Sequence, residues 1–127
     1  MDGASYKAME FSGEVITNLT MAGRLTMCNM AVEAGAKNAI IEPDRITLEY
    51  VRGRARRNYQ LYHSDPNAEY VEIKEYKVDK IEPQVAFPPL PSNTKGISEI
   101  DRIEIDQVII GSCTNGSLED LRLAAKV

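Results

Sequence analysis

The amino-acid sequence predicts an α/β fold, and a three-layer α/β/α arrangement fits it best. Short apolar runs typical of buried strands, at residues 38–42 and 106–111, alternate with stretches that carry helical spacing and capping residues. Interleaved helices and short strands are typical of domains in which helices cover the faces of a sheet. The length of 127 residues is that of one ordinary domain, enough to bury a core.

Composition and charge exclude several classes of function. Hydrophobic residues make up 43% and charged residues 27% of the chain, which is typical of a globular protein. The net charge of -4 argues against a nucleic-acid partner, and the apolar runs are too short for a membrane span. The start of the chain lacks the basic and apolar pattern of a signal peptide. Cys28 and Cys113 stand far apart, so we expect no disulfide framework and a cytoplasmic location.

Two helices are predicted in the first third of the chain. Apolar residues at helical spacing predict the first over residues 6–20 and the second over residues 22–34. Gly35 follows the second helix as a favourable C-cap residue. The apolar stripe of this second helix has four members at i, i+3, i+4 and i+7, namely Met27, Met30, Ala31 and Ala34.

A strand and a third helix come next. Residues 38–42 predict a short buried strand, and Asp44 is a suitable N-cap for a helix over residues 45–51. The arginine-rich stretch 52–57 is interpreted as a solvated helix end, where cations suit the helix dipole. Contact with a phosphate or a partner is the alternative.

The second half of the chain predicts two strands separated by a proline-rich stretch, then a helix. Residues 70–78 alternate apolar and polar, which predicts an exposed strand. Residues 82–96 contain four prolines and predict an extended crossing segment or an inter-domain linker. Residues 106–111 predict a compact strand, and residues 117–127 a helix that starts with capping-box spacing at Ser117 and Asp120.

The most informative local feature is the small-residue loop around Cys113. The predicted strand ends at Gly111, and the loop leads directly into the capped helix. Ligands collect at such carboxyl ends of strands, glycines allow close approach, and open amides at a helix start favour anions. Cys113 is therefore a candidate nucleophile or soft-metal ligand. The alternative is a tight turn that carries a small buried cysteine.

A second candidate site lies on the predicted helix 22–34. Asn29 and Glu33 are four residues apart, so they share a face opposite the apolar stripe and could point into one polar pocket. An ordinary solvated face is the alternative, and Cys28 beside them is interpreted as a packing residue. His63 is interpreted as a surface residue, and Glu82 has no visible partner.

Three segments resemble signature blocks of the aconitase family. Residues 21–36 (MAGRLTMCNMAVEAGA) with 41–44 (IEPD) resemble the first block. Residues 81–85 (IEPQV) and 105–120 (IDQVIIGSCTNGSLED) resemble two further blocks. Their order and spacing are similar to those of the large subunits of 3-isopropylmalate dehydratases and the related archaeal-type homoaconitases, and the resemblance covers nearly the whole chain.

The resemblance implies an iron-sulfur hydro-lyase of leucine biosynthesis, which isomerises 3-isopropylmalate and 2-isopropylmalate by dehydration and rehydration. It implies a [4Fe–4S] cluster in which one iron has no cysteine ligand and acts as a Lewis acid on the substrate hydroxyl. Cys113 would be one of three cluster thiolates. Glu33 would hold the water or hydroxyl at the open iron, and Asn29 would be a polar contact beside it. The implied partners are a small hydroxy-diacid substrate and a small subunit that carries the swivelling domain.

The chain lacks parts that the resemblance requires. The sequence contains no Cys-x-x-Cys that could supply the other two thiolates. We therefore expect an internal fragment that by itself neither holds a stable cluster nor turns over. Residues 1–97 would belong to one aconitase-like α/β domain, and residues 98–127 would start the next domain, which carries the cluster loop.

Three other functions remain open at this point. The nearest is a homoaconitase or a related hydro-lyase of 2-hydroxy-diacids, because the residues that set specificity are not in this chain. A non-catalytic module that binds a partner or a small acid belongs to a different class. A thiol-dependent enzyme that uses Cys113 alone is poorly supported, because no Cys–His pair is visible.

Overall fold

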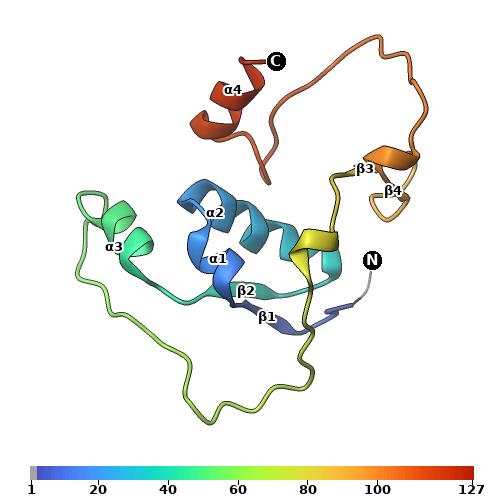
Figure 1. Ribbon diagram of the computed structural model, residues 1–127. Helices are drawn as coiled ribbons and strands as arrows, with labels where there is room; N and C mark the ends of the chain where they lie inside the picture. Colours follow the sequence, from blue (N-terminus) through green and yellow to red (C-terminus); the bar gives the residue numbers. More distant parts are fainter. Residues whose placement is uncertain (1–2) are drawn as a thin grey trace. The chain divides into compact units, whose positions relative to one another are not determined.

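The computed structural model describes residues 3–127 (Figure 1). Contacts along the chain form two compact units. The larger unit combines residues 3–69 with 110–127, and the smaller unit consists of residues 70–109. The domain boundary expected between residues 97 and 98 stays a prediction. Within residues 3–127, every helix is too short or too polar to cross a lipid bilayer.

The larger unit is built on two parallel strands, β1 (Ala8–Phe11) and β2 (Asn38–Ile41). Ala8 pairs with Asn38 and Phe11 with Ile41. Parallel strands cannot be joined by a tight turn, and here helices make the connection. Helix α2 (Met21–Met30) packs against β2 (Figure 1). The α/β class predicted from the sequence is confirmed, and the strand predicted at residues 38–42 is confirmed as β2.

The helix predicted over residues 6–20 is wrong. Its first half is strand β1, and only α1 (Glu14–Asn18) is helical. Gly13 separates the two with a φ of 106°, a backbone conformation that residues other than glycine rarely adopt. The physical reason is tertiary pairing: Met9 and Phe11 pack against the core, and the backbone between them bonds to β2.

The helix predicted over residues 22–34 is confirmed, with a tighter final turn. α2 continues as a 3-10 helix over Ala31–Ala34 and stops at Gly35, which has a φ of 85°. The amide of Ala36 donates to the Ala31 carbonyl and that of Gly35 to the Val32 carbonyl, at 3.1 and 2.9 Å. This pair of bonds is the Schellman arrangement that the predicted C-cap glycine makes accessible.

The core under α2 is small and consists mainly of alanine side chains. Ala4, Ala31 and Ala36 are its buried members. Partly buried apolar side chains pack around them, namely Met9, Phe11, Ala34 and Ala39. Because alanines bury little apolar area, other interactions must hold the helices in place.

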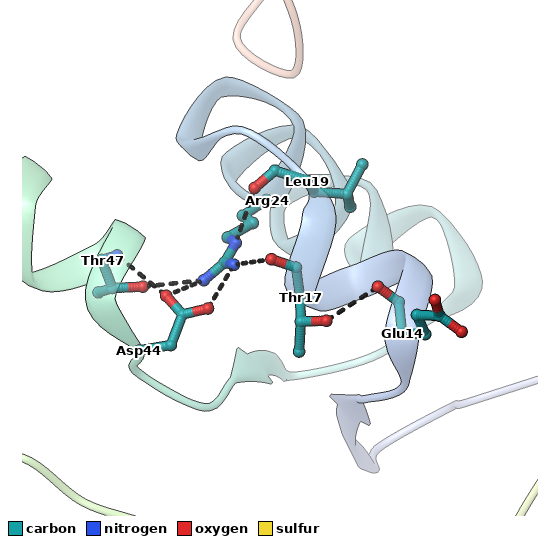
Figure 2. A network of polar contacts seen from close by, with 6 residues as sticks. All are labelled: Glu14, Thr17, Leu19, Arg24, Asp44 and Thr47. Carbon is teal, nitrogen blue, oxygen red and sulfur yellow. Dashed lines mark hydrogen bonds and ion pairs between the residues drawn. The ribbon is translucent and has the colours of Figure 1, made fainter.

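Those interactions centre on Arg24, whose side chain is 3% exposed (Figure 2). Its Nη1 and Nη2 donate to the two Asp44 carboxylate oxygens at 2.7 and 2.6 Å. Nη1 also donates to Thr47 Oγ1, Nη2 to the Thr17 carbonyl, and Nε to the Leu19 carbonyl. All five guanidinium N–H donors therefore have an acceptor. The guanidinium ties α1, α2 and α3 (Arg45–Val51) together.

Asp44 is also the N-cap of α3, as predicted. Its Oδ1 accepts a hydrogen bond from the amide of Thr47 at 3.1 Å. The hydrogen bonds from Arg24 hold the pKa of the Asp44 carboxyl well below its usual range, and this cap bond adds to the effect. At the other end of α3, Arg54 lies over the Tyr50 ring and donates to the Tyr50 carbonyl. The arginines of residues 52–57 are exposed, which agrees with a solvated helix end, and contact with a phosphate or a partner stays untested.

The smaller unit contains an antiparallel hairpin of β3 (Gln84–Ala86) and β4 (Thr94–Gly96). Short 3-10 turns flank it at Val78–Lys80 and Ile97–Glu99. The proline-rich stretch 82–96 thus folds back on itself, so the prediction of an extended crossing segment is wrong, and its alternative of an inter-domain linker stays a prediction. Glu82, which had no visible partner in the sequence, accepts hydrogen bonds from the amide and hydroxyl of Ser98 at 3.1 and 2.8 Å.

The two strands predicted at residues 70–78 and 106–111 are wrong. Both stretches lack regular strand structure, and their apolar side chains are exposed, Val71 by 91% and Ile109 by 82%. The alternation of apolar and polar residues is present, but within residues 3–127 neither stretch pairs with a strand of a sheet. A strand needs such a partner for its amide and carbonyl groups.

The helix predicted near the end of the chain is confirmed as α4 (Leu118–Ala124), shorter than the predicted 117–127. The predicted capping box is present, with Ser117 and Asp120 each binding the other's backbone amide. The apolar side chains of α4 are largely exposed, including Leu118, Leu121 and Leu123.

Candidate functional site

The structure brings together two of the three residues singled out in the sequence. Asn29 lies on α2 and Cys113 on the loop before α4, 84 positions later. The Asn29 side-chain amide donates a hydrogen bond of 2.9 Å to the backbone carbonyl of Cys113. The two sequence blocks that contain them are therefore in direct contact within the larger unit. Both residues are exposed, so the contact lies at the surface of this chain.

Glu33, the third residue, lies on the 3-10 turn that continues α2. It is exposed, and within residues 3–127 no hydrogen bond or ion pair engages its carboxylate. The change from α-helical to 3-10 winding lies between Asn29 and Glu33. Their position one above the other on a regular helix, predicted from the spacing, is therefore altered, because a 3-10 turn needs fewer residues.

Helix α2 has two faces with different partners. Arg24 and Ala31 are buried against α1, α3 and the core. The opposite face carries Ala22, Leu25 and Thr26, which line an open hollow of about 250 Å³. The other wall of the hollow is the Cys113 loop, residues 112–117, with Asp120. The apolar stripe predicted from the sequence did not include Arg24, although Arg24 lies three residues before Met27 and seven before Ala31 and so shares their face. A charged residue on a buried face needs a partner, and this spacing therefore indicated one for Arg24.

The amides of the loop that leads into α4 are bound by side chains, whereas the anion site expected at the start of the helix stays a prediction. Four successive amides, of residues 114–117, donate to side-chain oxygens of the same loop and helix. The acceptors are Ser112 Oγ and Asp120 Oδ2. Hydrogen bonds from the Ser117 hydroxyl, and then from the amides of Ser117 and Gly116, hold the pKa of the Asp120 carboxyl below its usual range.

The two cysteines occupy different environments. Cys28 is half-buried on α2, and burial raises the pKa of its thiol, which agrees with the packing role expected for it. Cys113 is exposed on its loop, which contradicts the alternative of a small buried cysteine. An exposed thiolate on a glycine-bounded loop suits one ligand of an iron-sulfur cluster. Within residues 3–127, no group of three or more His, Cys, Asp or Glu side chains could hold a metal ion, so Cys113 would be a single ligand.

His63 lies at the surface, as expected, but it has a partner that the sequence did not indicate. Its Nδ1 is 2.5 Å from the Glu42 carboxylate, directly after β2. The neighbouring Ser64 donates to the Glu10 carboxylate on β1. These contacts hold the stretch that follows α3 against the strand pair.

Comparisons with known proteins agree with the resemblance seen in the sequence. The sequence model of the aconitase family (aconitate hydratase) matches residues 1–102. The chain is 62% identical over 127 residues to the 3-isopropylmalate dehydratase large subunit of Syntrophus aciditrophicus, and 64% identical to that of Thermodesulfovibrio yellowstonii. It is 63% identical over 129 residues to 3-isopropylmalate dehydratase large subunit 1 of Pyrococcus furiosus. Each alignment covers the whole chain, and the chain spans about 30% of the length of these relatives.

Proposed function

Because this chain belongs to the aconitase family, we propose that it is part of the large subunit of a 3-isopropylmalate dehydratase. The proposed reaction interconverts 3-isopropylmalate and 2-isopropylmalate by dehydration and rehydration in leucine biosynthesis, in the cytoplasm. The proposed partner is the small subunit of that enzyme. The observation that carries the proposal is the hydrogen bond from Asn29 to the Cys113 carbonyl, because it joins the two most specific sequence blocks at one surface.

Cys113 is proposed as one of three thiolates that bind a [4Fe–4S] cluster. Its exposed thiol and its place on a loop with small neighbours support this role. When bound, the cluster supplies a Lewis acid for the substrate hydroxyl. The other two thiolates must come from residues outside this sequence, which contains no Cys-x-x-Cys.

Asn29 and Glu33 are proposed to act next to that thiolate. The Asn29 amide holds the Cys113 carbonyl, so it fixes the loop against α2. Glu33 is exposed nearby in the sequence with a carboxylate that no group in residues 3–127 engages. Such a carboxylate can orient a water or the substrate hydroxyl and exchange a proton with it.

Arg24 is not proposed as a contact for the substrate carboxylates. Arginine forks commonly bind carboxylates in pairs of hydrogen bonds. In this chain all five donors of Arg24 are taken by protein oxygens, and the side chain is buried. The residues that bind the carboxylates of a hydroxy-diacid, and so distinguish 3-isopropylmalate from homoaconitate, are expected outside this sequence.

A chimeric large subunit tests the proposal. Residues 1–127 replace the matching segment of one of the relatives described above, and the product is expressed with that relative's small subunit. We expect anaerobic cluster assembly, seen as broad visible absorbance with matching iron and sulfide, and turnover of 3-isopropylmalate. A chimera that assembles the cluster but turns over none of 3-isopropylmalate, homoaconitate and citrate would contradict the proposal. Turnover of homoaconitate alone would show that homoaconitate, and not 3-isopropylmalate, is the substrate.

Matched variants of the chimera test the individual residues. Cys113→Ser should abolish the cluster absorbance, whereas Cys28→Ser should leave it unchanged, because Cys28 lies half-buried on α2 and away from the loop sequence that resembles the cluster block. Glu33→Gln should keep the absorbance and lower kcat by about 10²–10⁴-fold, the range for loss of a general acid or base. A Glu33→Gln variant with an unchanged kcat would remove this residue from the proposed site.

The isolated 127-residue chain should neither hold a stable cluster nor turn over, because it offers one exposed thiolate. Anaerobic reconstitution of the chain with iron and sulfide checks this expectation. Cluster absorbance with matching iron and sulfide contents in the isolated chain would show that the other two ligands are not needed.

A further inference from the structure

Contacts within the Cys113 loop itself close the loop. A Cβ added at Gly116 would lie 2.9 Å from the Gly111 Cα and 3.3 Å from the Ser112 amide nitrogen. Gly116 also has a φ of 143°, which favours glycine. The two ends of the loop are therefore in contact, and only glycine permits that approach. The amide of Ser112 closes the ring with a 2.7 Å hydrogen bond to the Asn115 carbonyl.

Ser112 binds the first part of the loop from inside. Its Oγ accepts hydrogen bonds from the amides of Thr114 and Asn115, at 3.1 and 3.2 Å. One hydroxyl oxygen thus orders the two residues that follow Cys113. Because the Ser112 hydroxyl oxygen is the acceptor for both amides, these amides need no further partner in the folded loop.

Asp120 binds the second part of the loop from α4. Its Oδ2 accepts hydrogen bonds from the amides of Gly116 and Ser117, at 3.3 and 2.7 Å, and from the Ser117 hydroxyl at 2.6 Å. Glu119 is the other acidic residue in the first turn of α4, but these three bonds all go to Asp120. Asp120 therefore differs from Glu119 in its position relative to the loop and not in its charge.

The Cys113 thiol makes one long contact in this loop. The Cys113 carbonyl is held by Asn29, and the Cys113 Sγ lies 4.0 Å from Thr114 Oγ1. The side chain is exposed on a loop whose following amides are already bound. Such a loop presents the thiol as a ligand and does not first have to be ordered by the metal.

We propose that Ser112 and Asp120 are positioning residues whose side-chain oxygens build the Cys113 loop before any metal arrives. The role of the thiol as a ligand rests on the proposed function, whereas the order of the loop does not. A ligand held in place in advance avoids the loss of conformational entropy at the moment of metal binding. Ser112 fixes the chain directly after the thiol, and Asp120 fixes the return of the loop to α4.

Amide exchange and cysteine resonances in the metal-free 127-residue chain test this proposal. Asp120→Ala should speed exchange of the Gly116 and Ser117 amides at least tenfold and shift the Cβ resonance of Cys113. The Cβ resonance of Cys28 serves as an internal reference and should not move. Glu119→Ala is the matched control, since it removes the same charge from the same turn, and should change these rates less than twofold.

Conservative variants separate positioning from helix capping. Asp120→Asn keeps an acceptor oxygen, so the Cβ resonance of Cys113 should stay close to its wild-type position. Ser112→Ala should speed exchange of the Thr114 and Asn115 amides before that of the other loop amides. Wild-type amides that exchange at the rate of an unstructured chain would overturn the proposal. Fraying of α4 in Asp120→Ala with the Cys113 resonance unmoved would also overturn it, and would leave Asp120 as a cap alone. Because no metal is present, failure here is distinct from failure of the chimera to turn over.

Discussion

Residues 8–51 and residues 70–109 show two outcomes for short apolar stretches. In the first region, β2 finds β1 alongside it, and both become strands. In the second region, residues 70–78 alternate more regularly but belong to no sheet of the described residues, and Val71 is 91% exposed. The difference shows that alternation indicates which face of a strand would be buried. Whether a strand forms depends on a neighbouring backbone that local sequence does not reveal.

The two regions also differ in how polar side chains stabilise them. In the first region, the buried Arg24 connects three helices through one guanidinium. In the second, the Glu82 carboxylate binds Ser98, close to the hairpin it supports. The first network couples distant segments, and the second is local. Substitutions should therefore have large effects in the first region and small, confined effects in the second.

The largest effect is expected from Arg24→Ala. It leaves the Asp44 carboxylate without its main partner and removes the link among α1, α2 and α3. We expect a loss of about 3 kcal/mol in the free energy of unfolding, at the low end for a buried pair because Asp44 is partly exposed. Urea unfolding of the chain measures it. Arg45→Ala is the matched control, since Arg45 pairs with Glu49 at the surface, and should cost less than about 0.5 kcal/mol.

Gly35→Ala should have the next largest effect. Gly35 has a φ of 85°, and an added Cβ would lie 2.8 Å from Ser5 Oγ and 3.1 Å from its Cα. The backbone conformation alone costs a non-glycine residue about 1–2 kcal/mol, and the contact with Ser5 adds to it. Gly53→Ala separates the two contributions, because Gly53 has a φ of 80° but no heavy atom within 4 Å of its added Cβ. Equal losses of stability in both variants would show that Ser5 moves away from the added Cβ at no cost in free energy.

The ion pair of the first region should also appear as a dependence of stability on pH. The pKa of Asp44 is lowered in the folded chain, below the unfolded value of about 3.9. The stabilisation is therefore complete well above that value and is lost as the pH falls through it toward the folded pKa. Asn does not titrate, so the difference in unfolding free energy between wild type and Asp44→Asn should shrink from pH 6 to pH 2.5. A difference that stays constant over this interval would contradict the assignment.

Gly96→Ala should act on the second region alone. An added Cβ would lie 1.9 Å from Glu82 Oε1, so the Glu82 side chain must move and release Ser98. Loss of these exposed hydrogen bonds should cost about 1 kcal/mol, seen as faster exchange of the Ser98 amide with the β2 amides unchanged. Glu82→Ala removes the obstacle, so the double variant should be no less stable than Glu82→Ala. Additive losses would instead place the cost of Gly96→Ala in the backbone.

Much of the fold was predicted where the signal is local. Gly35, Asp44 and Ser117 end or begin helices through their own backbone conformation or side chain, and all three were predicted from the sequence. Strand β1 was predicted as part of a helix, because pairing with β2 decides its structure from 30 positions away. A pattern within the segment cannot contain that information.

The candidate site follows the same division. The loop position of Cys113 and the helix position of Asn29 were predicted, but their contact across 84 positions was not. Asp120 supplies an internal acceptor for the amides of Gly116 and Ser117 just before α4, whereas the anion site expected at the start of the helix stays a prediction. The capping-box spacing already placed Asp120 at that end of the helix. The spacing therefore contained the signal that those amides would be occupied.

The smallest effect is expected from Val71→Ser, and it tests the comparison most directly. Val71 is 91% exposed and lies in no strand, so the substitution should change the free energy of unfolding by less than about 0.5 kcal/mol. Ile41→Ser on the half-buried end of β2 is the reference and should cost at least about 1 kcal/mol in the same urea titration. A comparable cost at Val71 would mean that residues 70–78 form a packed strand in solution. The alternation in the sequence would then have been sufficient to specify it.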